Sequence, residues 1–380
     1  MSASGPIPSR RLVAGHVFFF PAATAYAIFV LPASVLALTG HTRAFPALAS
    51  PAGHAHEMLF GFALAVVAGN QLGPMRTPRL AFLFGLWAIA RATFLYAPQS
   101  IAASATNIAF ATLLAAQLAP RLLKAAKKLR NQALPIVLIA ICGSSIAFQI
   151  AARADYTILV MAVLFFALLL LFMGGRLIAP AVAGQFYRQG GKLDARVQPR
   201  IESALIVLMT LAVTTAAFED RPLAAATAGM ATLAAGLLAA VRLLRWRLWA
   251  LRGRRDLLCL AAGYGWLAIG LMLFGAALAE GRQQTTALHV IMVGGLGTLT
   301  LNVMAMTWAL RARQNPERAF LPVWGTILIA AATLARGLAG LGVYATQALL
   351  LAASFCWSGA FALLLIRLIR VRAQGAPNRG

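Results

Sequence analysis

Long apolar runs separated by short polar linkers dominate the pattern of the chain. Most of the runs approach the roughly 20 residues that an α-helix needs to cross a bilayer. We therefore predict an all-α polytopic membrane protein with about twelve transmembrane helices. These predicted helices cover residues 15–38, 57–73, 80–97, 100–119, 134–151, 156–173, 201–218, 223–241, 257–279, 285–310, 320–341 and 344–366.

The linkers between these runs predict how the helices are grouped. Very short turns join the third and fourth helices, the fifth and sixth, the seventh and eighth, and the last two, which predicts four antiparallel hairpins. The longest linker separates two groups of six helices. We expect a single membrane domain over residues 1–380, composed of a first six-helix half (1–173), a central cytoplasmic loop (174–200), a second six-helix half (201–370) and a cytoplasmic tail (371–380).

Composition supports the membrane prediction and excludes other classes. Of the 380 residues, 61% are hydrophobic and only 11% are charged, which a soluble domain of this size could not accommodate. The net charge of +24 would suit a nucleic-acid-binding protein. However, the basic residues form short clusters between apolar runs and no separate basic domain, so we expect no nucleic-acid partner. The three cysteines lie within apolar runs, without the spacing of a metal site or a disulfide framework.

The basic residues also predict the orientation of the helices. Alternate linkers are poor in Lys and Arg, and hold only Arg43, Arg153, Arg221 and Arg282 of the 33 basic residues. The other linkers and both ends of the chain hold nearly all the rest. Because cytoplasmic loops carry the excess of Lys and Arg, both termini are predicted to be cytoplasmic.

The most unusual polar cluster lies at the start of the second predicted helix. His54, His56, Glu57 and Met58 stand together in a chain with only five histidines and nine acidic residues. Neutral imidazole is a good ligand for Cu, Fe and Zn. The two histidines would act together only if residues 53–56 are extended and the helix begins near Glu57, because positions i and i+2 lie on opposite sides of a helix. Two interpretations are open: a metal or haem site, or polar residues at a membrane interface.

The tenth predicted helix carries a second set of candidate residues. His289 enters this helix from the same predicted outer side as His54 and His56, and Met292 follows one turn later. Three glycines follow: Gly294, Gly295 and Gly297. Because glycine has no side chain, they would let either a flat ligand or a neighbouring helix approach the backbone.

Two arginines fall inside predicted helices, where a charge is costly and usually has a purpose. Arg91 and Arg336 both lie in the predicted outer half, which also holds the histidines. They would either pair with Glu57 or with carboxylates of a bound cofactor, or extend their side chains to the outer headgroups.

Three blocks of the sequence resemble the signature blocks of the NnrS family. They read His-Ala-His-Glu-Met-Leu-Phe-Gly-Phe from His54, Gly-Gly-Arg-Leu-Ile from Gly174, and a glycine-rich stretch with Thr-Leu-Thr-Leu between His289 and Met304. The resemblance implies a multi-pass protein of the bacterial inner (plasma) membrane that binds haem and copper. It also implies a role in the response to nitric oxide, without assigning a reaction.

On this resemblance, the metal ligands are predicted to be His54, His56 and His289. Glu57 would orient one of the imidazoles, while Arg91 and Arg336 would balance cofactor carboxylates. The thioethers of Met58 and Met292 would also line the cofactor site, which we expect near the outer face. The lipid bilayer and nitric oxide are the predicted partners, and no protein partner is predicted.

The chain departs from the family pattern at two places on the predicted cytoplasmic side. Family members usually continue the second helix into an Asn-Trp-Thr-Gly block, where this chain has residues 69–77. They usually end the tenth helix with Gly-His-Thr-Gly-Arg, where this chain has no histidine at residues 308–313. We therefore expect a divergent member that holds haem, copper, both or neither.

Two further functions fit the sequence. Twelve spans with cytoplasmic termini are typical of secondary transporters, and a membrane scaffold or sensor without a cofactor would need no conserved chemistry. No P-loop, HExxH or GxSxG motif points to an enzyme of those classes, and whether the protein is an enzyme at all is left open.

Overall fold

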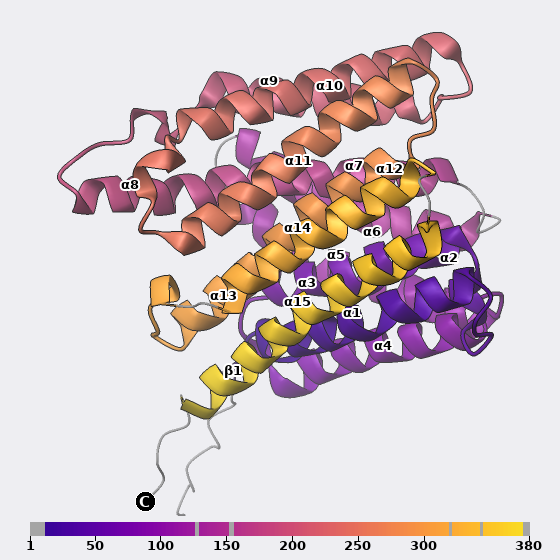
Figure 1. The fold of residues 1–380 in the computed structure, drawn as a ribbon. Helices are drawn as coiled ribbons and strands as arrows, with labels where there is room; N and C mark the ends of the chain where they lie inside the picture. Colours follow the sequence, from indigo (N-terminus) through magenta and orange to yellow (C-terminus); the bar gives the residue numbers. More distant parts are fainter. Residues whose placement is uncertain (1–11, 126–128, 152–155, 319–320, 343–344, 375–380) are drawn as a thin grey trace, which may run out of the picture.

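The computed structural model describes residues 12–125, 129–151, 156–318, 321–342 and 345–374, almost all of them in long helices that run side by side (Figure 1). Within this part of the chain, eleven helical stretches are long and apolar enough to cross a membrane. The predicted all-α polytopic fold is thereby confirmed. The long helices are α1 (His16–Leu38), α4 (Thr77–Tyr96), α5 (Ile101–Ala125), α6 (Leu129–Ile150), α7 (Tyr156–Met173), α9 (Pro199–Ala216), α10 (Pro222–Arg245), α11 (Arg255–Ala279), α13 (Thr298–Arg311), α14 (Leu321–Gly340) and α15 (Thr346–Gln374).

Shorter elements link or extend these helices. They are β1 (Leu12–Val13), η1 (Pro46–Ala49), α2 (Pro51–His56), η2 (Glu57–Ala63), α3 (Leu64–Gln71), β2 (Met75–Arg76), η3 (Gly174–Ile178), α8 (Ala179–Arg188), η4 (Asp194–Arg196), η5 (Leu248–Leu251), α12 (Thr285–His289), η6 (Val290–Gly297) and η7 (Pro316–Arg318). The two short strands pair antiparallel, so that residues just before α1 are tied to the linker before α4.

The second predicted span is built from three helical pieces. α2, η2 and α3 follow one another without a gap from Pro51 to Gln71, and the residues at their junctions keep right-handed helical backbone angles. The combined helix is long enough to cross a bilayer. Together with the eleven stretches above, it accounts for all twelve predicted spans.

The region predicted as a central cytoplasmic loop is largely helical. Residues 174–200 were expected to be irregular, but α7 continues through η3 and α8 as far as Arg188. The helix passes through the Gly174-Gly175 pair, whose lack of side chains allows close packing of Tyr264 and Arg242, as described below. Only the stretch from 189 to 198 connects α8 to α9, with η4 inside it.

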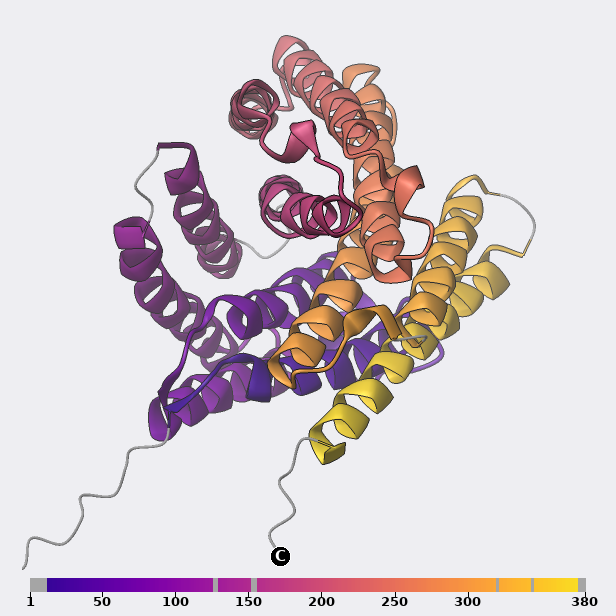
Figure 2. The ribbon, with the colours of Figure 1, turned by 90° about the vertical axis from the view of Figure 1, so that its left-hand side faces the viewer.

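The packing of the helices follows the predicted hairpins and also brings the first and last long helices together. α4 packs against α5, α6 against α7, α9 against α10, and α14 against α15. α15 also lies along α1 (Figure 1), where Trp357 Nε1 donates to the Ala27 carbonyl (3.2 Å) and Ser358 Oγ donates to the Ile28 carbonyl (2.8 Å). In Figure 2 the indigo and purple helices lie below and to the left, and the pink to yellow helices lie above and to the right.

Among the residues that the structure describes, three segments adopt π-helical turns, which are rare and often occur at functional sites. They are η2, η3 and η6, and each overlaps one of the three blocks singled out in the sequence. A π-turn shifts the hydrogen bonding from i+4 to i+5, and it leaves a nearby carbonyl available to another donor. Trp87 Nε1 donates to the Gly61 carbonyl in η2 (3.0 Å), and Arg242 Nη1 donates to the Leu171 carbonyl just before η3 (3.0 Å).

Candidate functional site

The first candidate ligands lie on a helix that begins earlier than predicted. Ser50 caps α2 by accepting a hydrogen bond from the Gly53 amide (3.1 Å), and Pro51 occupies the first turn, where it needs no amide partner. His54 and His56 are therefore helical. The condition for the two histidines to act together, an extended segment over residues 53–56, is not met, and the two imidazoles point to different sides of the helix.

His54 instead faces His289 from a distant part of the chain. The two imidazole rings are nearly parallel, with an angle of 14° between their planes and 6.3 Å between their centroids. One ring comes from α2 and the other from α12, which lie at the same end of the molecule (Figure 1). The prediction that the second and tenth spans bring their histidines together is thus supported for this pair, and both side chains are half-buried.

Each of these two rings uses Nδ1 in a hydrogen bond within the protein, so Nε2 is the nitrogen considered as a metal ligand. Nδ1 of His289 lies 2.7 Å from the Thr285 carbonyl, and because a carbonyl only accepts, Nδ1 must carry the proton. In the neutral ring, Nε2 then has a lone pair. Nδ1 of His54 lies 2.8 Å from the Ser34 hydroxyl, which can either donate or accept, so this contact orients the ring without fixing which nitrogen carries the proton. Such partners orient an imidazole for metal binding through its other nitrogen.

The distance between the rings suits a shared metal ion. Imidazole nitrogen binds zinc at about 2.0–2.1 Å, and at that bond length two rings on opposite sides of one ion have centroids about 6 Å apart. Across the described ranges, no group of three or more His, Cys, Asp or Glu side chains is placed to hold a metal ion. The donor set here therefore consists of two imidazoles. It fits a metal whose remaining positions are filled by something other than the protein.

A cation lies beside the histidine pair. The guanidinium of Arg336 on α14 is within electrostatic range of both His54 and His289. α14 packs closely on α12 because Gly340 has no side chain, and a Cβ atom there would come within 2.1 Å of Thr286 Oγ1. Arg336 thus places a positive charge near the two rings, and its predicted role in balancing cofactor carboxylates stays a prediction.

His56 lies on the other side of α2, in a separate buried cluster. Its ring is fully buried and stacks on Phe94, with 3.8 Å between centroids and 22° between planes. Nδ1 is 2.9 Å from Glu57 Oε1, and Nε2 is 2.8 Å from the side-chain amide nitrogen of Gln149. Since both ring nitrogens have protein partners, the structure does not bring His56 together with the other two predicted ligands.

Glu57 is the centre of this buried cluster. Its carboxylate accepts hydrogen bonds from the Tyr26 hydroxyl and from Arg91 Nη1, the latter at 2.7 Å. Arg91 is only 4% exposed and also donates to the Asn107 amide oxygen. The predicted Glu57–Arg91 pair is confirmed, and Arg91 does not extend to the headgroups. Glu57 orients His56 and not the facing pair of imidazoles.

The three glycines of the tenth span contact neighbouring helices. A Cβ atom at Gly294 would come within 2.9 Å of the Trp266 ring, and one at Gly297 within 2.5 Å of the Trp357 ring. Gly295 faces the backbone of Leu267. Of the two interpretations, close approach of a neighbouring helix is therefore the one observed. Met58 and Met292 are partly buried and pack against the hydrophobic core, and their predicted cofactor role stays a prediction.

Sequence reasoning missed several polar partners. Ser34 and Thr285 hold the two facing imidazoles, and Tyr26, Asn107 and Gln149 complete the buried cluster. Asn107 and Gln149 carried a usable signal, because an amide inside an apolar span needs a partner. Ser34 carried none, since a serine within a helix commonly bonds to its own backbone.

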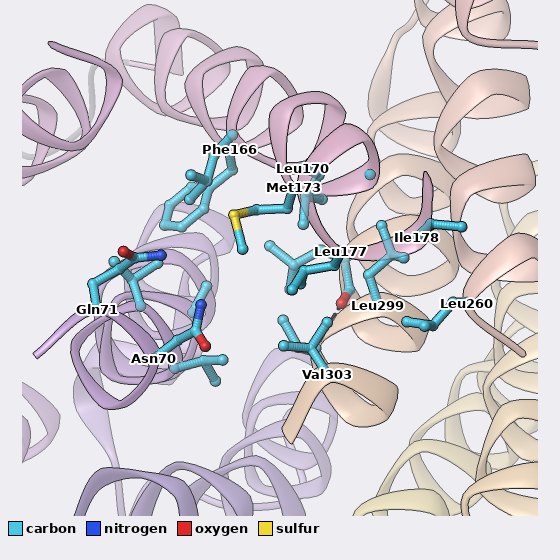
Figure 3. A pocket seen from close by; sticks show the side chains of 17 residues that line it. Asn70, Gln71, Phe166, Leu170, Met173, Leu177, Ile178, Leu260, Leu299 and Val303 are labelled. Carbon is cyan, nitrogen blue, oxygen red and sulfur yellow. Dashed lines mark hydrogen bonds between the residues drawn. The ribbon is translucent and has the colours of Figure 1, made fainter. Parts of the chain in front are cut away.

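An apolar cavity of about 60 Å³ lies elsewhere, between α3, α7 and α13 (Figure 3). Leucine, valine and phenylalanine side chains form most of its lining, with Met173 on one side. Asn70 and Gln71 provide polar groups at one end, and both belong to the first stretch that departs from the family pattern. None of the predicted ligands lines this cavity.

Comparison with known proteins supports the resemblance seen in the sequence. The family model described as NnrS protein matches residues 11–374, nearly the whole chain. No curated protein matches the chain.

Proposed function

Because this chain belongs to the NnrS family, we propose that it binds haem, copper or both near the periplasmic face of the bacterial inner membrane and takes part in the response to nitric oxide. When bound, such a cofactor would supply the metal to which nitric oxide binds. The observation that carries the proposal is the facing pair of His54 and His289, with nearly parallel rings 6.3 Å apart.

The donor set favours haem over a structural zinc ion. Zinc in structural sites takes four protein ligands, whereas a haem iron needs only axial ligands from the protein. Two imidazoles with Nδ1 held by Ser34 and Thr285 fit that requirement. Arg336 would offset the charge of the haem carboxylates. Copper bound by the same two nitrogens is the alternative within this proposal.

The basic residues support the placement of this site on the periplasmic side. Arg43 and Arg282 are among the few basic residues in the linkers next to α2 and α12, while the opposite end carries most of the Lys and Arg residues. By the positive-inside rule, the histidine pair then faces the periplasm and both termini face the cytoplasm. Nitric oxide, a small apolar molecule, would reach the pair through the lipid.

Absorption spectroscopy and metal analysis of the purified full-length protein test the proposal. We expect a Soret band or stoichiometric copper, with loss or a shift of the spectrum in both His54→Ala and His289→Ala. His41→Ala is the matched control, because His41 is exposed at the same end and contacts Thr39 and Gln347 instead. If the wild-type protein has neither haem absorption nor copper, the cofactor proposal fails and a cofactor-free transporter, scaffold or sensor is favoured.

A further inference from the structure

A polar cavity lies beside η3. η3 leads directly into α8, which lies at the end of the molecule opposite α2 and α12 (Figure 1). Its volume is about 130 Å³, whereas one water molecule needs only about 10–15 Å³. Its lining contains three arginines and one carboxylate, and consists of Phe172, Gly175, Arg176, Arg196, Val197, Glu202 and Arg242. The cavity is therefore large enough for a polyatomic group and is cationic overall.

Arg242 is held rigidly at the inner wall of this cavity. It is only 3% exposed; Nη2 donates to Glu202 Oε1 (2.8 Å) and Nη1 to the Leu171 carbonyl (3.0 Å). Its guanidinium also lies 5.4 Å from the centre of the Trp246 ring. Its Nε is buried and has no hydrogen-bond partner within the part of the chain that the structure describes. A fixed guanidinium of this kind loses little entropy when it binds an anion.

The glycines of η3 make this arrangement sterically possible. A Cβ atom at Gly175 would lie 2.2 Å from Arg242 Nη2, and one at Gly174 would lie 2.3 Å from the Tyr264 ring. The Gly-Gly pair therefore lets the guanidinium lie against the helix backbone. The next residue, Arg176, stands at the cavity, so the same short block builds the inner wall and supplies a second guanidinium.

The arginines of the cavity outnumber its acidic residue. Glu202 pairs with Arg242, and with Arg176 and Arg196 the lining holds three positive charges against one negative charge. Both of these side chains are exposed, and they come from different elements, η3 and η4. Two exposed guanidiniums and one buried guanidinium around one cavity form a site for a multiply charged oxyanion, since guanidinium matches phosphate geometry through paired hydrogen bonds.

We propose that Arg176, Arg196 and Arg242 form a pocket that binds a phosphate group, supplied either by an anionic lipid or by a small phosphate in solution. The lipid source agrees with the location. On the proposed topology the pocket is at the cytoplasmic surface, where basic pockets between membrane helices bind lipid head groups. The pocket shares no residue with the histidine pair, so the proposal stands whether or not a cofactor is bound.

Binding measurements with a charge-matched control test this pocket. The full-length protein in neutral detergent is titrated with inorganic phosphate, and separately with mixed micelles that contain phosphatidylglycerol. The test variant is Arg176→Gln/Arg196→Gln. The control is Arg200→Gln/Arg245→Gln, which removes two exposed arginines near the same surface that do not line the cavity. Both double variants leave the buried Arg242 in place and lower the net charge equally.

We expect the test variant to bind at least tenfold more weakly than the wild type, while the control changes less than twofold. Saturable binding of phosphatidylglycerol alone identifies a lipid head group, and saturable binding of inorganic phosphate identifies a small soluble ligand. Equal losses in the two double variants would show that binding depends only on surface charge. That result, or no saturable binding of either probe, would overturn the proposal.

Discussion

At the scale of single residues, the chain buries a charged pair in a span and encloses it with hydrogen bonds. Glu57 and Arg91 are almost completely inaccessible; Tyr26 and His56 also bond to the Glu57 carboxylate, and the Asn107 side chain accepts from Arg91. Nε of Arg91 has no hydrogen-bond partner among the described residues. A buried ion pair gains little over an apolar pair of similar volume, but removing one partner leaves an uncompensated charge. The cluster therefore specifies how α1, α2, α4 and α5 fit together more than it adds to stability.

Removing the cation of this pair should strongly destabilise the protein. For Arg91→Leu we expect a loss of about 3–5 kcal/mol in the free energy of unfolding, because the Glu57 carboxylate stays buried without its counter-ion. The second-site variant Glu57→Gln/Arg91→Leu should recover part of this loss, since the amide is neutral. Thermal unfolding in detergent measures both variants.

The control for this prediction is Arg282→Gln. Arg282 pairs with Glu280 at 2.6 Å, but the two side chains are 67% and 56% exposed. Solvent-exposed ion pairs contribute little to the free energy of unfolding, so this variant should unfold close to the wild-type temperature. An Arg91→Leu protein as stable as Arg282→Gln would show that the buried carboxylate does not depend on the guanidinium.

At the scale of elements, the sequence predicted the number and location of the helices well. It did not predict where α2 begins or which turns are π-helical. Apolar length alone identified the spans. Ser50 and Pro51 form a helix-capping signal that marks the start of α2. The predicted start near Glu57 did not use this signal. The π-turns could not be predicted from the sequence, because a change from i+4 to i+5 hydrogen bonding depends on partners such as Trp87 and Arg242 from other helices.

The η3 turn yields a prediction about its glycines. Gly175→Ala places a Cβ atom 2.2 Å from Arg242 Nη2, so the guanidinium must leave its position against the backbone. We expect destabilisation by about 1–3 kcal/mol, the usual cost of overpacking. Gly184→Ala in the adjoining α8 is the control, because nothing lies within 4 Å of its added Cβ.

In that control, alanine should stabilise the helix slightly, since glycine costs about 0.5–1 kcal/mol in a helix interior. The two unfolding temperatures should therefore move in opposite directions. Equal shifts for Gly175→Ala and Gly184→Ala would contradict the close approach of Arg242 to η3.

At the scale of the whole molecule, the apolar pattern alone could not reveal contacts between distant segments. The approach of His54 to His289 was predicted from the family resemblance, and the hydrogen bond from Trp357 to the backbone of α1 was not predicted. Apolar periodicity carries no information about which spans are neighbours. Apolar length correctly predicted both helices that carry the histidines. His56 was predicted to act with His54 because the two residues are close in the sequence.

The orientation of the whole molecule is the remaining prediction, and it follows from charge alone. An even number of spans places both termini on one side, and the bias in Lys and Arg places that side in the cytoplasm. A green fluorescent protein fused after the last residue should therefore fluoresce in cells, because it folds only in the cytoplasm. Alkaline phosphatase inserted next to Arg282, in the linker between α11 and α12, should be active, because it needs the periplasm to form its disulfides.

The exchanged fusions are the controls, and both should be inactive. An active alkaline phosphatase at the C-terminus, with a dark fluorescent fusion there, would reverse the orientation. The histidine pair would then face the cytoplasm, and the arginine pocket would face the periplasm. A mixed result, with the C-terminus and the Arg282 linker on the same side, would instead mean that one of the segments between them does not cross the membrane. The broken second span lies outside that interval, so its crossing is tested separately by a phosphatase insertion next to Arg43, which should also be active.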